Sequence, residues 1–338
     1  MNRYCAFISF LLIFHGAVGQ MHFGVMTYNC ENAFDTIHDS GFDDYEFLPD
    51  GEKQWKRWKF FDKIKKIARV ILSVDSVQPV DVVCLCEVEN DTVVDYLTKR
   101  TFLSRLGYEY LITKSDDSRG LDVALLYSPF TFKVFESQSI RNSLGAKTRD
   151  VLRASGELMT GDTLDVFALH LPSKLGGEKS EELREMIVKD VRKCIDSLFM
   201  SRLNPNIIVM GDFNSDANSP LITKTLSVNR CIENGGKYTD LCQLLYHSSN
   251  DSGTYKYRGV WSAIDNIFVS RSVLSDYNSI YTKPEWCRII DLPFLLENDK
   301  SDRSKRPRRS FLGDYYRNGF SDHLPVYLKF EYLFNKEN

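Results

Sequence analysis

Two short polar motifs, each joined to a run of apolar residues, constrain the fold of this chain more than any other feature. Asp212 and Asn214 follow the apolar run 207–210, whereas Asp322 and His323 precede an apolar run. Runs of this length are typical of buried strands. A carboxylate at the end of a buried strand is costly unless it binds a cation or another partner. The motifs therefore predict a pocket where strand ends gather acidic groups, an amide and an imidazole.

Apolar periodicity predicts the other main elements of the chain. We expect strands at 23–29, 81–88, 121–127, 163–171, 206–210, 264–270 and 324–330, and helices at 60–74 and 180–203. Ser180 is a candidate cap for the second helix. Several successive strands have no helix between them, which favours an α/β fold of two sheets with outer helices over a single doubly wound sheet.

Polar side chains stand at or near the ends of six of these strands. They are Asn29, Glu87, His170, Asp212, Asn214, Asp265, Asp322 and His323. Hard oxygen donors of this type suit magnesium or manganese rather than zinc. The histidines indicate proton transfer and phosphate contact.

Single members of this set also have structural explanations. Asn29 and Asn214 could satisfy turn backbone, and Asp265 could cap a turn. His170 alone could be structural. Glu87 is harder to explain in this way, because a glutamate within an apolar strand needs a partner.

Six segments, taken in order, resemble the endonuclease/exonuclease/phosphatase superfamily with its DNase I-like fold. They are residues 28–32, 85–90, 169–173, 211–214, 264–269 and 321–325. The resemblance covers about residues 22–331 and is closest in form to an exported bacterial branch. It implies a four-layer α-β-β-α sandwich, in which two mixed β-sheets pack face to face between outer helices. The superfamily cleaves DNA, RNA, phosphoinositides, sphingomyelin and other phosphate esters, so the motifs leave the substrate open.

The resemblance also implies a metal site. Glu87 would be the main magnesium ligand, with Asn29 and Asp322 beside the metal. Manganese could replace magnesium, and the sequence leaves the number of ions, one or two, open.

The same resemblance implies roles on the water and phosphate side. Asp212 would activate or orient the attacking water, and Asn214 would contact the phosphate or steady that water. His323 would contact the scissile phosphate, oriented by Asp265. His170 would bind the phosphate or assist the leaving oxygen. Whether Asp212 or His323 is the base stays open.

Other residues could contact the substrate. Lys174 and Arg119 are candidates, although a loop lysine and a turn arginine look the same in sequence. The basic run 300–309 could guide a polyanion or form a surface loop. Trp55 and Trp58 could stack on bases, but core packing is the simpler account.

The N-terminus has the pattern of a secretion signal. Arg3 supplies a positive charge, 6–14 an apolar core, and 17–19 a small-residue cleavage pattern. A buried first strand or helix is the alternative. We therefore expect residues 1–19 to be a signal peptide, residues 20–338 to form one domain, and the product to be periplasmic or extracellular, without a transmembrane segment.

Eight cysteines are present, and Cys5 lies in the expected signal, so an odd number remains in the mature chain. Strand alternation predicts that Cys30 and Cys86 turn away from the metal, and we expect both to be buried free thiols.

These features predict a secreted, magnesium-dependent phosphoesterase that hydrolyses phosphodiester bonds. A nuclease, endonuclease-like, is the first choice, because His170 and the basic run suit a nucleic acid. A phosphatase or a phospholipid or sphingomyelin phosphodiesterase is the alternative, favoured by a pocket too narrow for a duplex. A non-catalytic binding protein is a remote alternative, because no expected catalytic position is missing. The net charge of −3 requires any nucleic-acid affinity to come from a local patch and a metal. We expect a monomer and infer no protein partner.

Overall fold

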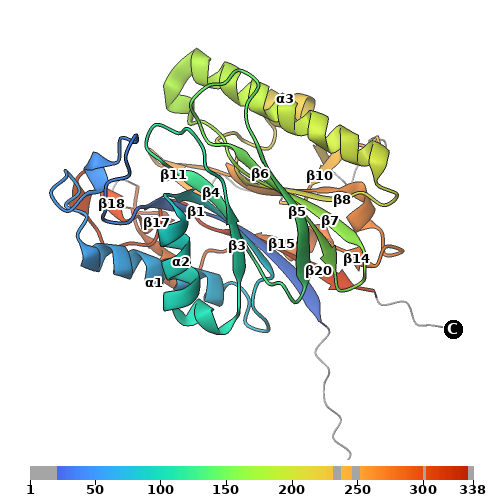
Figure 1. Ribbon diagram of the computed structural model, residues 1–338, viewed down its shortest axis with the longest axis horizontal. Helices are drawn as coiled ribbons and strands as arrows, with labels where there is room; N and C mark the ends of the chain where they lie inside the picture. The colour runs from blue at the N-terminus through green and yellow to red at the C-terminus, as the bar shows by residue number, and fades with distance from the viewer. Residues whose placement is uncertain (1–20, 231–236, 246–251, 300–301, 334–338) are drawn as a thin grey trace, which may run out of the picture.

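Two β-sheets lie face to face in the middle of the molecule, and helices cover their outer faces (Figure 1). The computed structural model describes residues 21–230, 237–245, 252–299 and 302–333. Helices α1 (Arg57–Ser73) and α2 (Asp91–Arg100) cover one sheet, and α3 (Gly177–Ser201) covers the other. The layer order α-β-β-α confirms the predicted sandwich.

The first sheet has seven strands in the order β14-β20-β1-β2-β4-β3, with β15 also paired to β20. Their bounds are β1 His22–Ala33, β2 Val82–Val88, β3 Glu109–Ile112, β4 Asp122–Tyr127, β14 Ile280–Tyr281, β15 Cys287–Ile289 and β20 Val326–Tyr332. Strands β1 and β2 are parallel, whereas β20 and β4 pair with them antiparallel, so the sheet is mixed.

The second sheet also has seven strands, in the order β5-β6-β7-β8-β13-β10-β9. Their bounds are β5 Phe132–Ile140, β6 Val151–Leu158, β7 Thr163–His170, β8 Asn206–Asp212, β9 Val228–Arg230, β10 Leu241–Gln243 and β13 Asp265–Ser270. Strands β7 and β8 are parallel, and β13 runs antiparallel to β8.

Short elements fill the loops. The small hairpins are β11 Tyr255–Tyr257 with β12 Val260–Ser262, β16 Leu296–Asn298 with β17 Lys305–Pro307, and β18 Phe311–Leu312 with β19 Tyr315–Tyr316. The short helical turns are η1 Tyr45–Phe47, η2 Phe102–Arg105, η3 Lys174–Gly176, η4 Leu221–Thr225, η5 Arg271–Leu274, η6 Pro284–Trp286 and η7 Pro293–Leu295.

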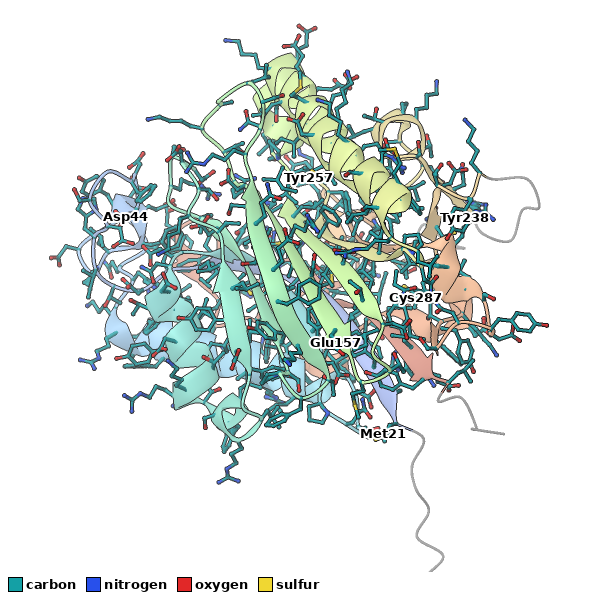
Figure 2. The ribbon with its side chains drawn as sticks, turned by 45° about the vertical axis from the view of Figure 1, so that its right-hand side comes forward. Met21, Asp44, Glu157, Tyr238, Tyr257 and Cys287 are labelled. Atoms are coloured by element: carbon teal, nitrogen blue, oxygen red, sulfur yellow. The ribbon has the colours of Figure 1, made fainter. Side chains whose placement is uncertain are left out.

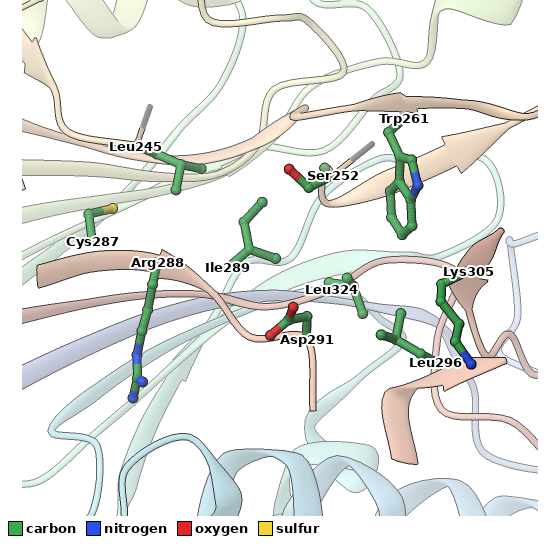
Figure 3. Close-up of a pocket in the computed structure, with 11 residues that line it drawn as sticks. Leu245, Ser252, Trp261, Cys287, Arg288, Ile289, Asp291, Leu296, Lys305 and Leu324 are labelled. Atoms are coloured by element: carbon green, nitrogen blue, oxygen red, sulfur yellow. The ribbon is translucent and has the colours of Figure 1, made fainter. Parts of the chain in front are cut away.

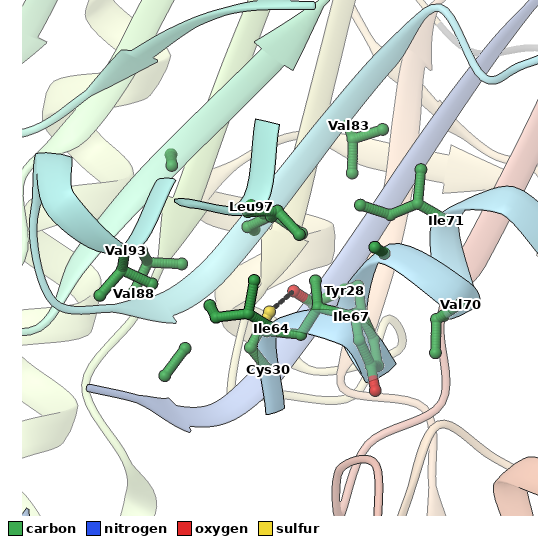
Figure 4. Close-up of a cluster of buried hydrophobic side chains, with 14 of the residues drawn as sticks. Tyr28, Cys30, Ile64, Ile67, Val70, Ile71, Val83, Val88, Val93 and Leu97 are labelled. Carbon is green, nitrogen blue, oxygen red and sulfur yellow. Dashed lines mark hydrogen bonds between the residues drawn. The ribbon is translucent and has the colours of Figure 1, made fainter. Parts of the chain in front are cut away.

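Apolar side chains fill all three spaces between the layers. Strand alternation sends Val25 into the core between the sheets and Tyr28 to the outer side of the first sheet. There Ile64 and Ile67 of α1 pack on the sheet, as Figure 4 shows. On the second sheet, Ile187 and neighbouring residues of α3 form the third cluster. Each fully buried aliphatic side chain contributes roughly 1.5–3 kcal/mol, so burial in three layers fixes the strand ends relative to one another.

The seven expected strands correspond to β1, β2, β4, β7, β8, β13 and β20, and the two expected helices correspond to α1 and α3. Helix α3 begins three residues earlier than predicted, because Ser180 does not cap it. The Ser180 hydroxyl instead donates to the carbonyl oxygen of Ser173 at 2.5 Å. Strand β5 was missed because most of its side chains are exposed and polar, which removes the apolar signal.

Cys30 and Cys86 are both free and buried, as expected, and Cys30 has the predicted orientation, but the orientation predicted for Cys86 is wrong. Cys30 lies in the cluster under α1, whereas Cys86 lies between the sheets. The reason is an irregularity after Cys86, where the register shifts and Glu87 has a φ of +62°. This bulge breaks the two-residue alternation on which the prediction relied.

The structure tests the predictions for the two tryptophans but does not describe the expected signal peptide. Trp55 is fully buried, which confirms its packing role, whereas Trp58 is largely exposed. The expected signal peptide, residues 1–19, lies outside the described residues. In the part of the chain that the structure describes, no helix is both long and apolar enough to cross a membrane.

We predict that Gly211→Ala strongly destabilises the fold. A Cβ on Gly211, whose φ is +145°, would lie 1.8 Å from the carbonyl oxygen of Leu169 on the neighbouring strand. A cost on the order of 3 kcal/mol should lower the melting temperature by several degrees in thermal unfolding. The control is Gly161→Ala, where φ is +83° but nothing lies within 4 Å. Equal losses in the two variants would show that close approach to Leu169 is unimportant.

Candidate active site

The site lies where four strands end and two begin. Asn29 and Glu87 lie near the ends of the parallel strands β1 and β2, and the parallel pair β7 and β8 ends at His170 and Asp212. Strand β13 begins at Asp265, opposite Asp212 in the antiparallel register. The two sheets therefore bring these side chains to one end of the sandwich. Figure 2 shows Met21, which precedes β1, and Tyr257 of β11 toward opposite ends of the molecule.

The amide of Asn29 joins two carboxylates across the two sheets. Its Nδ2 donates to Oε1 of Glu87 at 3.1 Å and to Oδ2 of Asp212 at 3.0 Å. The other oxygen of Glu87 accepts from the backbone N–H of Asn32 at 2.8 Å. In the described part of the chain, neither carboxylate forms an ion pair with a lysine or arginine; their charged partners are histidines. One buried carboxylate, Asp212, and one partly exposed carboxylate, Glu87, therefore share one neutral amide.

Left-handed backbone conformations recur around these carboxylates. The φ angles are +62° at Glu87, +58° at Asn32 and +46° at Asn214. Such angles cost free energy for residues other than glycine and persist where surrounding structure enforces them. At Asn214 the backbone N–H donates to Oδ1 of Asp212 at 2.8 Å, and its side-chain amide donates to the carbonyl of Leu171 at 2.9 Å. The strained turns thus aim polar groups at the ends of the strands.

Asp265 and His323 form a buried pair. Nδ1 of His323 lies 2.8 Å from Oδ2 of Asp265, which leaves Nε2 directed toward Asp212, 3.9 Å from its Oδ2. The ring of Tyr255 packs on the His323 ring at 4.8 Å between centroids. The hydroxyl of Thr254 accepts from the backbone of Asp265, so the β11–β12 hairpin contacts both members of the pair.

His170 is buried beside the carboxylates. Its Nε2 lies 3.6 Å from Oδ2 of Asp212 and 4.0 Å from Oε1 of Glu87, and its Nδ1 has no hydrogen-bond partner among the described residues. Burial, followed by the charges of Arg149, His323 and Arg119, lowers the pKa of His170 well below its usual value.

The pKa values of Asp212 and His323 are raised, in contrast to that of His170. Burial and the neighbouring Asp265 raise the pKa of Asp212 to about 7. Burial alone would lower the pKa of His323, but Asp265, Asp212 and Asp322 together raise it well above the usual histidine value. The cluster therefore carries an excess of negative charge that its own residues only partly compensate.

A cavity of about 390 Å³ opens at these groups. Its lining includes eleven polar or charged residues and four with large aromatic or aliphatic side chains: Glu87, Arg119, Arg149, His170, Ser173, Lys174, Leu175, Asp212, Asn214, Tyr255, Tyr257, Ser262, Ile264, Asp322 and His323. A volume of this size is typical of a small-molecule site. Of the predicted site residues, only Asn29 and Asp265 lie behind this surface rather than on it.

The two residues predicted to contact substrate, Arg119 and Lys174, differ in exposure and in their ion pairs. The guanidinium of Arg119 donates to Oδ1 of Asn32 at 3.1 Å and pairs with no carboxylate among the described residues. Lys174 is on the exposed rim, 3.5 Å from a carboxylate oxygen of Asp216. Arg149, which sequence reasoning missed, also lines the cavity and pairs with Asp117 at 2.8 Å. Arg149 stands outside any strand-end motif, so no local pattern could have identified it.

Asp322 lies on the cavity wall but has a cationic partner. Nη2 of Arg309 is 2.5 Å from Oδ2 of Asp322. Another arginine of the basic run, Arg306, pairs with Glu297 at 2.7 Å. Lys300 lies outside the described residues. The basic run is thus partly neutralised, which weakens the hypothesis that it guides a polyanion.

The donor set fits a hard divalent cation. Glu87 and Asp212 supply carboxylate oxygens and lack a lysine or arginine partner, as such an ion requires. Atoms of Asp212, Asp265 and His323 also lie within 4.8 Å of one another. We favour Glu87 and Asp212 as ligands, because Asp265 already binds Nδ1 of His323 and the Oδ1 of Asn29 already accepts from the backbone N–H of Glu31.

A second cavity, of about 460 Å³, shares no lining residue with the first (Figure 3). Trp261, Ile289 and Leu296 contribute much of its lining, and Asp291 is the only acidic residue among its lining residues. It therefore lacks the carboxylates of a cation site.

Comparison with known proteins identifies the scaffold. A family model described as the Endonuclease/Exonuclease/phosphatase family matches residues 24–332. No curated protein matches the chain. Among solved structures, the human Nocturnin catalytic domain with bound sulfate is 18% identical with a TM-score of 0.53, covering 92% of this chain and 95% of that one.

Two further structures have comparable scores. D. rerio TDP2 complexed with single-strand DNA product is 17% identical with a TM-score of 0.55, covering 92% of this chain and 99% of that one. The mannosyl-6-phosphatase of Bacteroides thetaiotaomicron is 20% identical with a TM-score of 0.55, covering 92% of this chain and 100% of that one. At these identities the likeness shows a shared fold.

We predict that Mg²⁺ or Mn²⁺ stabilises this protein and that Glu87→Gln removes most of the effect. An ion at 100 times its Kd adds about 2.7 kcal/mol, a rise on the order of 5 °C in melting temperature by calorimetry. Glu89→Gln is the control, because Glu89 does not line the cavity and its carboxylate instead accepts from the backbone N–H of Asp35 at 2.6 Å. Equal responses in both variants would contradict the role of Glu87.

Proposed function

This chain belongs to the endonuclease/exonuclease/phosphatase family, and on that basis we propose that it hydrolyses phosphate esters with a divalent cation. We propose phosphodiester bonds of nucleic acid as the first substrate and Mg²⁺, replaceable by Mn²⁺, as the cation. The observation that carries the proposal is the Asp265–His323 pair, which lies in one cavity with the Asn29-linked carboxylates.

In this proposal Glu87 holds the cation, which neutralises charge on the phosphate when bound, and Asn29 lies beside it and orients the carboxylates of Glu87 and Asp212. The Nε2 of His323 contacts a phosphate oxygen, because Asp265 fixes the ring through Nδ1. Asp212 holds the attacking water, and Asn214, tied to Asp212 through its backbone N–H, contacts the water or the phosphate.

His170 lines the same cavity, beside Glu87 and Asp212. Its Nε2 is within 4.0 Å of both Glu87 and Asp212, so a phosphate held between these carboxylates and the cation is also in its reach. We propose that it hydrogen-bonds a phosphate oxygen or the leaving oxygen.

The small size of the cavity argues against a duplex, which by the criterion drawn from the sequence favours a phosphatase or lipid phosphodiesterase, but a single strand also fits. Its volume of about 390 Å³ admits one flexible strand or a terminal nucleotide. Tyr255 and Tyr257 line it, and Tyr257 is 52% exposed, so its ring offers a stacking surface for a base. The likeness to TDP2 bound to a single-strand DNA product supports this choice.

A phosphatase is the second candidate. Arg119, Arg149 and Lys174 bring three cationic side chains to a cavity of small-molecule size, which suits the doubly charged terminal phosphate of a monoester. The likeness to a mannosyl-6-phosphatase supports this alternative. A phospholipid or sphingomyelin diester belongs in the same test.

We also propose that the protein is exported and that residues 20–338 form one domain. The charged, apolar and small-residue pattern of residues 1–19 supports export. The family match over residues 24–332 supports one domain. N-terminal sequencing of the mature protein should begin at Gln20, and an intact Met1 would contradict export.

We predict that a substrate panel detects Mg²⁺-dependent hydrolysis that EDTA abolishes. The panel holds single-stranded DNA, RNA, plasmid, sugar phosphates, inositol phosphates and sphingomyelin. His323→Ala should lower kcat on the best substrate about 10³-fold, because it removes the phosphate contact. His38→Ala is the control, since His38 pairs with Asp44 and does not line the cavity.

Turnover of no phosphoester with any divalent metal would sink the catalytic proposal. Turnover of monoesters alone would replace the nuclease with the phosphatase, and turnover of sphingomyelin alone would select the lipid phosphodiesterase.

We predict that Arg119→Gln raises KM about tenfold or more, because a charge-assisted hydrogen bond to phosphate is lost. Arg141→Gln is the matched control, since Arg141 is exposed, pairs with Asp116 and does not line the cavity. Steady-state kinetics at saturating Mg²⁺ measure the difference. An unchanged KM for Arg119→Gln would show that this guanidinium does not contact substrate.

A further inference from the structure

Arg309 is a cationic residue that forms ion pairs with acidic residues at the edge of the site. Its Nη2 lies 2.5 Å from Oδ2 of Asp322, and its Nε lies 4.0 Å from Oε1 of Glu31. Asp322 lines the cavity, whereas Arg309 does not. The guanidinium, whose side chain is 30% exposed, therefore reaches the cavity wall through Asp322.

Glu31 ties this arginine to the protein interior. It is 7% exposed, with a φ of +52°, and its carboxylate accepts from the backbone N–H groups of Ser310 and Phe311 at 2.5 and 3.3 Å. These bonds hold the segment that carries Arg309 against β1. Buried hydrogen bonds therefore fix the position of the segment that carries the guanidinium.

Lys63 of α1 completes the group. Its side chain is buried, and Nζ donates to the hydroxyl of Ser310 at 2.6 Å and to the carbonyl of Phe320 at 2.8 Å. Two basic side chains, Arg309 and Lys63, therefore accompany two acidic ones, Glu31 and Asp322. The charges around Asp322 compensate one another within the protein.

Glu87 and Asp212, which line the same cavity, differ. Glu87 and Asp212 have no lysine or arginine partner in the described ranges, and Asp265 is matched by His323. Two uncompensated negative charges there equal the charge of one divalent ion. Around Asp322 no such excess exists, so a second divalent ion would have to displace Arg309.

We propose that Arg309 stands in for a second metal ion, so that the site takes one divalent cation and Asp322 is not among its ligands. This inference rests on the proposed function and reverses the role that the sequence predicted for Asp322. Arg309 is a positioning residue in this account, because it acts through Asp322 rather than on substrate.

Two other roles for Arg309 fit the contacts less well. A substrate contact requires a free guanidinium, whereas that of Arg309 is paired with Asp322 and Arg309 is not among the residues that line the cavity. Steering of a polyanion requires an unpaired charge, whereas Arg309 pairs with Asp322.

Calorimetric titration of the metal-free full chain with Mn²⁺ alone tests the stoichiometry without any substrate. We expect one Mn²⁺ per wild-type chain and two per Arg309→Gln chain, because the variant frees Asp322. Arg306→Gln is the matched control: it lies on the same segment, pairs with Glu297, and should bind one ion. Two ions in the wild type, or one in Arg309→Gln, would overturn the inference.

Asp322→Asn provides a second test that does not depend on the stability of the arginine variant. Because Asp322 is not a ligand in this account, Mn²⁺ affinity should stay within about threefold of wild type. A ligand role predicts a loss of about tenfold or more, which would overturn the inference. Failure of the wild type to bind any Mn²⁺ would instead refute the proposed function, so the two failures are distinguishable.

Discussion

The hydrogen bonds from the Asn29 amide to Glu87 and Asp212 are the contacts on which the site depends. Asn29 and Glu87 lie near the ends of neighbouring strands of the first sheet, whereas Asp212 ends a strand of the second. Two like charges can meet across the seam only because three packed cores hold the sheets in register. Because the two carboxylates repel each other and are shielded from water, neutralising them with a cation would lower the free energy of the site.

The fold also supplies the strain that the site requires. Glu87 and Asn214 hold left-handed backbone conformations, and Gly211 lies so near β7 that no side chain fits. Such positions are stable only when rigid strands enforce them. The charges are divided as well: Glu87 and Asp212 are left without basic partners, whereas Arg309 compensates Asp322. Glu87 and Asp212 thus keep the charge that a metal ion would neutralise, whereas the charge of Asp322 is already matched by Arg309.

The strand ends could be predicted from sequence because each polar group follows or precedes a regular apolar run. Asp212 and His323 are examples, and the sheets bring them within 3.9 Å of each other. The partner of Asp322 could not be predicted, because Arg309 reaches it through a loop of 12 intervening residues that has no periodic signal. The orientation of Cys86 failed for a related reason, since a one-residue bulge at Glu87 reverses the expected alternation.

A crystal structure of the Mn²⁺-soaked protein, with anomalous scattering measured for the metal, tests the central claim most directly. The account predicts one anomalous peak bound by the Glu87 carboxylate at the Asn29–Asp212 contact, with the Asp322–Arg309 pair intact. A peak bound by Asp265 and His323, or no peak near Glu87, would contradict it.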